Sequence, residues 1–152
     1  MDLKETIRSI PDWPIKGVIF RDLTTLMQNP LAFKKSCDIL YDRYKDMSID
    51  KIVGIDARGF VFGAVLAYKL GIGFIPVRKK GKLPWKTIQE TYSLEYGEDT
   101  LEIHEDAVEK GEKVVIVDDL IATGGTVGAT VKLVKKLEAQ IIECAFIVEL
   151  PE

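Results

Sequence analysis

Residues 114–126 read VVIVDDLIATGGT. A run of branched apolar residues leads into two adjacent aspartates, Asp118 and Asp119, and a Thr-Gly-Gly-Thr turn follows at 123–126. A short apolar run predicts a strand buried on both faces of a parallel sheet. After the turn, apolar residues recur at helical spacing, which predicts a helix. The stretch is therefore typical of a strand, a turn and a helix in an α/β protein.

The rest of the chain alternates predicted strands with predicted helices. Strands are predicted at 51–56, 72–77, 113–118 and 141–150. Helices are predicted after the capping residue Asn29, over 59–70 with Gly71 as the stop, and after Thr126. Alternation in 90–96 and 100–104 predicts a hairpin that lies outside the main sheet. We therefore expect an α/β fold with a mostly parallel sheet flanked by helices, and binding at the carboxyl ends of its strands.

Composition and charge narrow the class of protein. The chain has 152 residues, 47% of them hydrophobic, and a net charge of −3, so we expect one domain that does not coat nucleic acid. It has no apolar run long enough to span a bilayer, and its N-terminus lacks the apolar core of a signal peptide. Cys37 and Cys144 are its only cysteines, which favours two reduced thiols in a cytoplasmic protein. The single histidine, His104, is expected at the surface or rim.

The turn at 123–126 has the chemistry of a phosphate site. Gly124 and Gly125 let successive backbone N–H groups point at one spot, where the following helix adds a partial positive charge. Thr123 and Thr126 add hydroxyl donors, and the aspartate pair can accept hydrogen bonds from a vicinal diol. Phosphate and diol together indicate a ribose 5-phosphate. An ordinary strand–turn junction, with acids that cap backbone amides, is the plainer alternative.

These motifs resemble those of a known family. VVIVDDLIATGGT closely resembles the phosphoribosyl diphosphate (PRPP) signature of type I phosphoribosyltransferases. Four further segments are similar, in order, to adenine phosphoribosyltransferases: WPIKGVIFRDLT (13–24), GIDARGFVFG (54–63), PVRKKGKLP (76–84) and TYSLEYG (91–97). The resemblance spans about residues 8 to 150. It implies a single domain over 1–152, with a small N-terminal hood at 1–30 and a flexible lid loop and hairpin at 78–104.

The resemblance also implies the site residues. PRPP or its ribose phosphate would bind Asp118, Asp119, Ala122, Thr123, Gly124, Gly125 and Thr126. Pyrophosphate would bind Asp56, Ala57, Arg58, Gly59, Arg78, Lys79 and Lys82, with a non-proline cis peptide between Asp56 and Ala57. The base would bind Ile19, Phe20 and Arg21. The catalytic residues would be Glu95, which exchanges a proton with the purine, and Arg58.

The implied reaction transfers the phosphoribosyl group of PRPP to adenine and gives AMP and pyrophosphate. Mg²⁺ would be carried by PRPP with no direct protein ligand, and a homodimer is implied because lid cations reach the partner's site in the family. Members of the family usually continue beyond the position of Glu152. Two alternatives stay open: a PRPP-sensing regulatory protein, and a phosphoribosyltransferase for xanthine or guanine. Locally, the cations at 78–86 are also compatible with a solvated loop, Arg58 with a surface arginine, and Glu95 with a solvent-facing strand residue.

Overall fold

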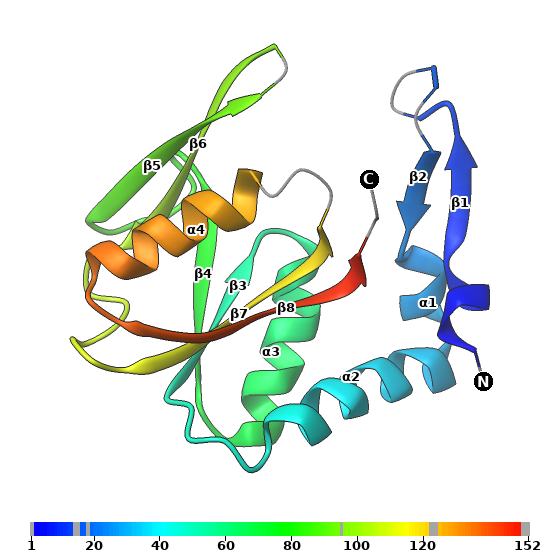
Figure 1. The fold of residues 1–152 in the computed structure, drawn as a ribbon, viewed down its shortest axis with the longest axis horizontal. Helices are drawn as coiled ribbons and strands as arrows, with labels where there is room; N and C mark the ends of the chain where they lie inside the picture. The colour runs from blue at the N-terminus through cyan, green and yellow to red at the C-terminus, as the bar shows by residue number, and fades with distance from the viewer. Residues whose placement is uncertain (1, 14–15, 18, 95, 122–124, 150–152) are drawn as a thin grey trace. The chain divides into compact units, whose positions relative to one another are not determined.

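The computed structural model describes residues 2–13, 16–17, 19–94, 96–121 and 125–149. The chain divides into two compact units, Met1–Arg43 and Tyr44–Glu152, whose α-helices and strands are labelled in Figure 1. Within the described residues, no helix combines the length and the hydropathy that a membrane crossing requires.

The first unit holds a small antiparallel sheet and three short or medium helices. Its elements are the 3₁₀ helix η1 (Leu3–Thr6), the strands β1 (Arg8–Pro11) and β2 (Ile19–Asp22), and the helices α1 (Thr24–Gln28) and α2 (Pro30–Tyr44). The predicted cap of α2 is confirmed, because Asn29 Oδ1 accepts the backbone N–H groups of Leu31 and Ala32, each at 3.1 Å. Cys37 and Leu40 of this helix are buried.

Asp22, the last residue of β2, connects this strand to β1 and to the start of α1. Its carboxylate accepts hydrogen bonds from the Nε and Nη2 of Arg8, at 3.0 and 2.6 Å, and from the backbone N–H of Thr24 at 2.9 Å. Hydrogen bonds from Thr24, and after them one from Arg8, lower the pKa of Asp22 to about 2. The ionised carboxylate thus ties β1, β2 and the start of α1 together.

We expect Asp22→Asn to destabilise the first unit at pH 7, because the ionised carboxylate that ties β1, β2 and α1 together is lost. The expected loss is about 1 kcal/mol, since solvent screens part of the interaction with Arg8. The folded-state pKa lies below the unfolded value, so this stabilisation is complete above pH 4 and is lost as the pH falls through about 2. Urea unfolding at pH 7 and pH 2.5 measures it, with the exposed Glu5→Gln as the control. An equal difference from wild type at both pH values would contradict this account.

The second unit is a six-stranded sheet with one helix on each face. Its elements are β3 (Lys51–Ile55), α3 (Arg58–Leu70), β4 (Gly73–Lys79), β5 (Thr87–Leu94), β6 (Gly97–His104), β7 (Lys113–Ile121), α4 (Gly125–Lys136) and β8 (Gln140–Glu149). The strand order is β5-β6-β4-β3-β7-β8. The four strands β4, β3, β7 and β8 run parallel, whereas β5 and β6 are antiparallel to their neighbours. The predicted α/β class and mostly parallel sheet are confirmed.

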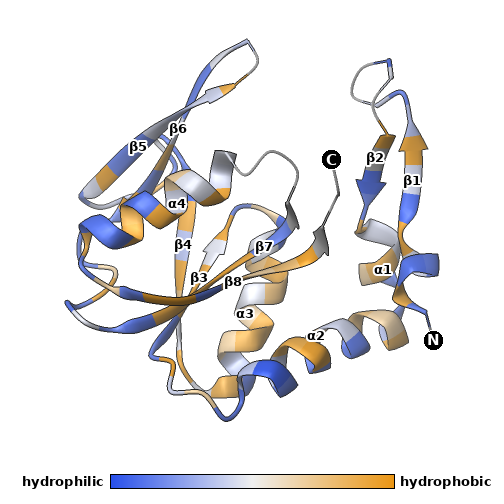
Figure 2. Cartoon of the chain, in the orientation of Figure 1, coloured by the Kyte–Doolittle hydropathy of each residue, from blue (hydrophilic) through white to orange (hydrophobic). Residues whose placement is uncertain are grey.

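The two helices cover opposite faces of this sheet. The crossover from β3 to β4 runs one way along the sheet and the crossover from β7 to β8 runs the other way, so right-handed connections place α3 and α4 on opposite sides. Side chains alternate accordingly, with Val53 and Ile55 in the core cluster that α4 joins and Ile52 close to Gly63 of α3. Figure 2 shows α3 as largely hydrophobic and α4 as mixed, as expected for a helix with one solvated face.

The hairpin prediction was wrong in one respect. The hairpin β5–β6 joins the main sheet, because Arg78 and Lys79 of β4 pair with Glu102 and Leu101 of β6. The apolar run of β4 suggested a strand that ends at Val77, but the backbone ladder continues for two charged residues beyond it. The basic segment at 78–86 therefore starts inside the sheet and stands next to a strand of the hairpin.

Candidate functional site

The carboxyl ends of three strands meet at one edge of the second unit. β3 lies between β4 and β7 and runs parallel to both. Asp56 follows β3, Arg78 and Lys79 are the last residues of β4, and Asp118 and Asp119 lie within the last four residues of β7. These strand ends and the segments after them carry most of the residues that the sequence predicts for the site. The strand order therefore brings together groups that are far apart in the sequence.

Two ion pairs connect these segments. Arg58, the first residue of α3, pairs through Nε with the Oδ2 of Asp119 on β7. Arg78 of β4 pairs through Nε with the Oδ2 of Asp56, at 3.0 Å. The peptide bond between Asp56 and Ala57 is cis, as the resemblance implied. Each arginine is thus placed beside a carboxylate of a neighbouring strand, and two cations and two anions share this edge of the sheet.

Gly59 allows α3 to begin close to β7. A Cβ atom at Gly59 would lie 2.7 Å from the carbonyl oxygen of Val117 and 3.2 Å from the Cα of Asp118. Both of these atoms belong to the backbone of a central strand, so they cannot move aside as a flexible side chain would. The absence of a side chain at Gly59 is what permits Arg58 to approach Asp119.

Asp118 is a buried acid beside a second acid. Asp118 is 6% exposed. One carboxylate oxygen accepts the backbone N–H of Asp119 at 2.8 Å, and the other accepts the hydroxyl of Thr126 at 3.5 Å. Burial, and after it the hydrogen bond and charge of Asp119, raise the pKa of Asp118 to about 8. A strongly perturbed acid at the edge of a sheet is typical of a functional site.

Arg78 and Lys79, the last two residues of β4, contact groups of the same unit. Lys79 pairs with Asp99 of β6, and the Nη1 of Arg78 donates to the carbonyl oxygen of Lys82 at 3.5 Å. The side chains of Lys80 and Lys82 are exposed. Sequence reasoning identified the cations but missed Asp99 and Glu102, the acids of β6 that contact this segment, because an acid in an alternating strand reads as a solvent-facing residue.

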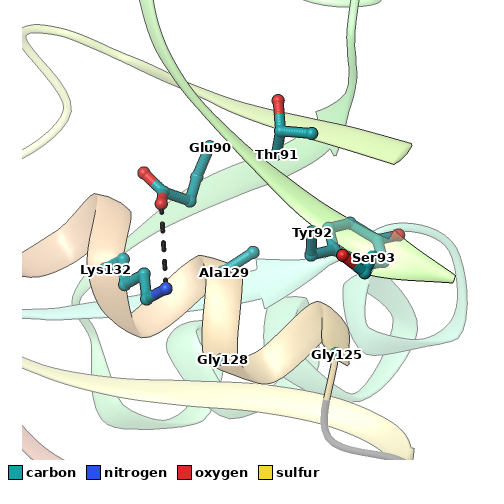
Figure 3. A pocket seen from close by; sticks show the side chains of 8 residues that line it. All are labelled: Glu90, Thr91, Tyr92, Ser93, Gly125, Gly128, Ala129 and Lys132. Atoms are coloured by element: carbon teal, nitrogen blue, oxygen red, sulfur yellow. Dashed lines mark ion pairs between the residues drawn. The ribbon is translucent and has the colours of Figure 1, made fainter. Parts of the chain in front are cut away.

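A pocket of about 340 Å³ lies between β5 and the first half of α4 (Figure 3). Its lining residues are Glu90, Thr91, Tyr92, Ser93, Gly125, Gly128, Ala129 and Lys132. Glu90 forms ion pairs with Lys132 at 4.0 Å and with Lys136 at 2.6 Å, so the hairpin is tied to the helix that begins at the glycine turn. The sequence carried no signal for this contact, since its partners are more than 40 residues apart.

Several predicted residues lie outside the described part of the chain. These are Glu95, Ala122, Thr123 and Gly124, and their roles stay predictions. Gly125 and Thr126 are the first two residues of α4. The base-binding candidates Ile19, Phe20 and Arg21 all belong to β2 of the first unit, where the guanidinium of Arg21 donates to the hydroxyl of Ser9.

The candidates for metal binding are His, Cys, Asp and Glu side chains, and the chain has one histidine, His104. Within these ranges, no group of three or more His, Cys, Asp or Glu side chains could hold a metal ion. His104, at the end of β6, is partly exposed, and its Nε2 is buried without a hydrogen-bond partner in the described part of the chain.

The fold and the charged edge define a phosphoribosyltransferase. The family model of the phosphoribosyl transferase domain matches residues 22–152. This range contains the aspartate pair, the glycine turn and both arginine–aspartate pairs.

An adenine phosphoribosyltransferase of Desulfosudis oleivorans is 66% identical over 152 residues, which cover 100% of this chain and 88% of the relative. The crystal structure of an adenine phosphoribosyltransferase from Thermoanaerobacter pseudethanolicus superposes with a TM-score of 0.93 at 50% identity, covering 97% of this chain and 86% of that one. A Saccharomyces cerevisiae adenine phosphoribosyltransferase, solved in complex with adenine and an imino-altritol bisphosphate, gives a TM-score of 0.92 at 44% identity, over 97% of this chain and 86% of that one. The chain belongs to the adenine phosphoribosyltransferase family.

Proposed function

We propose that this protein transfers the 5-phosphoribosyl group of PRPP to adenine and releases AMP and pyrophosphate. It is a glycosyltransferase of purine salvage. The observation that carries the proposal is the meeting of the aspartate pair, Arg58 and the Asp56–Arg78 pair at one edge of the sheet. The yeast relative solved with adenine supports the choice of base.

The residues of this edge suit the parts of PRPP. The turn at 122–126 binds the 5-phosphate, and Asp118 and Asp119 accept hydrogen bonds from the ribose hydroxyls. Asp56, Ala57, Arg58 and Gly59, together with Arg78, Lys79 and Lys82, bind the pyrophosphate. Negative charge grows on the pyrophosphate as the bond to the ribose breaks, so cations at this position stabilise the transition state.

Binding of PRPP also exchanges partners within the site. Arg58 and Asp119 neutralise each other in the structure. In the complex, Asp119 accepts hydrogen bonds from the ribose hydroxyls and Arg58 pairs with the negatively charged pyrophosphate, so neither side chain loses a partner. The ion pair thus holds both side chains near the positions that the substrate needs, which lowers the ordering cost of binding.

The base is bound by β2, through backbone groups of Ile19 and Arg21 and by stacking on Phe20. Glu95 exchanges a proton with the purine. We expect Glu95→Gln to lower kcat, because an amide cannot transfer that proton. Steady-state kinetics with saturating adenine and PRPP measure it, and a variant with the wild-type kcat would exclude this role for Glu95.

Mg²⁺ is the proposed cofactor. It prefers oxygen ligands and commonly keeps several waters while it binds phosphate groups. The edge suits an ion that the substrate carries, since the carboxylates of Asp118 and Asp119 offer oxygen atoms to its water ligands. Carried by the pyrophosphate of PRPP, without a direct protein ligand, the ion would neutralise part of the pyrophosphate charge.

We further propose a cytoplasmic homodimer. Within 78–104, we propose that the loop between β4 and β5 moves as a lid, because the hairpin β5–β6 pairs with the main sheet and Leu101 and Ile103 of β6 lie in its core. Apolar side chains stand exposed on one side of α3, among them Val61 and Tyr68, which supports a contact with a second copy. Analytical ultracentrifugation tests the dimer, and a monomer at micromolar concentration would contradict it.

One assay tests the activity. The protein is incubated with PRPP, Mg²⁺ and one nucleobase at a time, and the mononucleotide products are separated by chromatography. AMP from adenine, with no product from xanthine or guanine, is the expected result. Another mononucleotide would indicate a transferase for another base. PRPP binding without any product would indicate a regulatory protein.

A further inference from the structure

Glu102 of β6 contacts both ends of the loop that joins β4 to β5. The residue is 8% exposed. Its Oε1 accepts the backbone N–H of Gly81 at 2.7 Å, and its Oε2 accepts the hydroxyl of Thr87 at 2.7 Å. Gly81 and Thr87 stand at the two ends of the loop 82–86, so a single carboxylate holds both ends.

The backbone of the same region depends on this anchor. Gly81 has a φ of +86°, in the left-handed region that glycine adopts readily, and its N–H is directed to Glu102. The backbone also pairs on each side of the loop, since Lys80 donates to the carbonyl of Thr100 at 3.1 Å and Glu105 donates to that of Lys86 at 3.0 Å. The strand β6 thus acts as the base on which the loop is built.

A chain of contacts leads from this anchor to the proposed pyrophosphate site. The carbonyl of Lys82, next to Gly81, accepts the Nη1 of Arg78 at 3.5 Å. The Nε of the same guanidinium contacts Asp56 at 3.0 Å. The loop backbone therefore helps to orient the guanidinium of Arg78 at the edge of the sheet.

The charge of Glu102 also suits this place. The segment carries the cations Arg78, Lys79, Lys80, Lys82 and Lys86, and like charges in one short loop repel each other. The hydrogen bond from Gly81, and then the one from Thr87, lower the pKa of Glu102, so the group is ionised at neutral pH. A buried negative charge beneath the loop offsets part of the repulsion.

We propose that Glu102 is a positioning residue for pyrophosphate: it shapes the loop 82–86 and thereby holds Lys82 and Arg78 for the pyrophosphate group of PRPP. Glu102 does not itself contact the substrate. The inference rests on the proposed function, and it adds a residue that the predicted site did not include.

Glu102→Gln tests it in the full-length protein. The amide keeps the shape of the side chain but has one acceptor oxygen and no charge, so it cannot accept from Gly81 and Thr87 with both atoms. We expect the affinity for magnesium pyrophosphate, measured by calorimetry, to fall about tenfold, and the KM for PRPP to rise by a similar factor. The affinity for AMP and the KM for adenine should stay within about twofold, since neither ligand carries a pyrophosphate.

Two controls separate positioning from general damage. Glu105→Gln makes the same charge change at an exposed residue three positions away, and wild-type values are expected. Thr87→Val removes one of the two hydrogen bonds and should weaken pyrophosphate binding by about threefold, while Thr87→Ser keeps the hydroxyl and should restore it. The threonine variants also test the inference if Glu102→Gln does not fold.

The outcomes distinguish this inference from the proposed function. If the wild-type protein binds neither magnesium pyrophosphate nor AMP, the proposed function fails and the inference fails with it. If wild type binds both, and Glu102→Gln and Thr87→Val bind pyrophosphate as wild type does, only the inference is overturned. An equal loss of AMP and pyrophosphate affinity in these variants would also overturn it, because that result indicates a purely structural role.

Discussion

Asp118→Asn is expected to lower kcat/KM for PRPP by about a hundredfold and, at the same time, to raise the melting temperature at pH 7 and above by a few degrees. Activity falls because a buried carboxylate that accepts the ribose hydroxyls is lost. Stability rises because the asparagine side chain is neutral at every pH. It therefore removes both the cost of burying a charge and the repulsion by Asp119.

The sign follows from the pKa of Asp118, which burial and then Asp119 raise from 3.8 to about 8 in the folded protein. Between these two values the folded state binds more protons than the unfolded state, so the contribution of Asp118 to stability falls as the pH rises from about 4 to about 8. Wild type should therefore lose more stability than Asp118→Asn over this range.

Thermal unfolding at pH 5, 6.5 and 8 measures the effect, and steady-state kinetics measure the activity. Asp46→Asn, an exposed acid of the same unit, is the matched control and should change neither quantity. If Asp118→Asn is less stable than wild type at pH 8, then Asp118 does not destabilise the folded protein, and the proposed trade of stability for ligand binding is wrong.

Gly59→Ala is the second change for which we expect a large effect. The added Cβ would meet the carbonyl oxygen of Val117 at 2.7 Å and the Cα of Asp118 at 3.2 Å. Since neither backbone atom can yield, the start of α3 must move away from β7, at a cost of about 1–3 kcal/mol. Arg58 would then lose its place beside Asp119, and kcat/KM for PRPP should fall at least a hundredfold.

Gly73→Ala is the control for this experiment. A Cβ at Gly73 would meet only the Cγ of Lys51, at 3.7 Å, which is an ordinary contact. The melting temperature and kcat/KM of both variants give the comparison. If Gly59→Ala keeps wild-type activity, the close approach of α3 to β7 is not what positions Arg58.

The pattern of residues predicted most elements of the second unit because the signals are local. Short apolar runs mark β3 and β7 as buried strands. Gly71 ends α3 with a φ of +71°, since glycine takes a left-handed conformation without a steric penalty. The hairpin was misplaced because the two residues that join it to the sheet, Arg78 and Lys79, are charged and read as part of a loop.

The succession of strands and helices, the acid pair near the end of β7 and the glycine turn after it follow from the order of residues alone, because periodicity and turn chemistry depend on neighbours along the chain. Which charges meet depends on how the strands are arranged in the folded protein. Arg58 reaches Asp119 across 61 residues, and the loop at Gly81 rests on Glu102 across 21. Such pairs follow from the order and register of the strands, and no short stretch of sequence contains either.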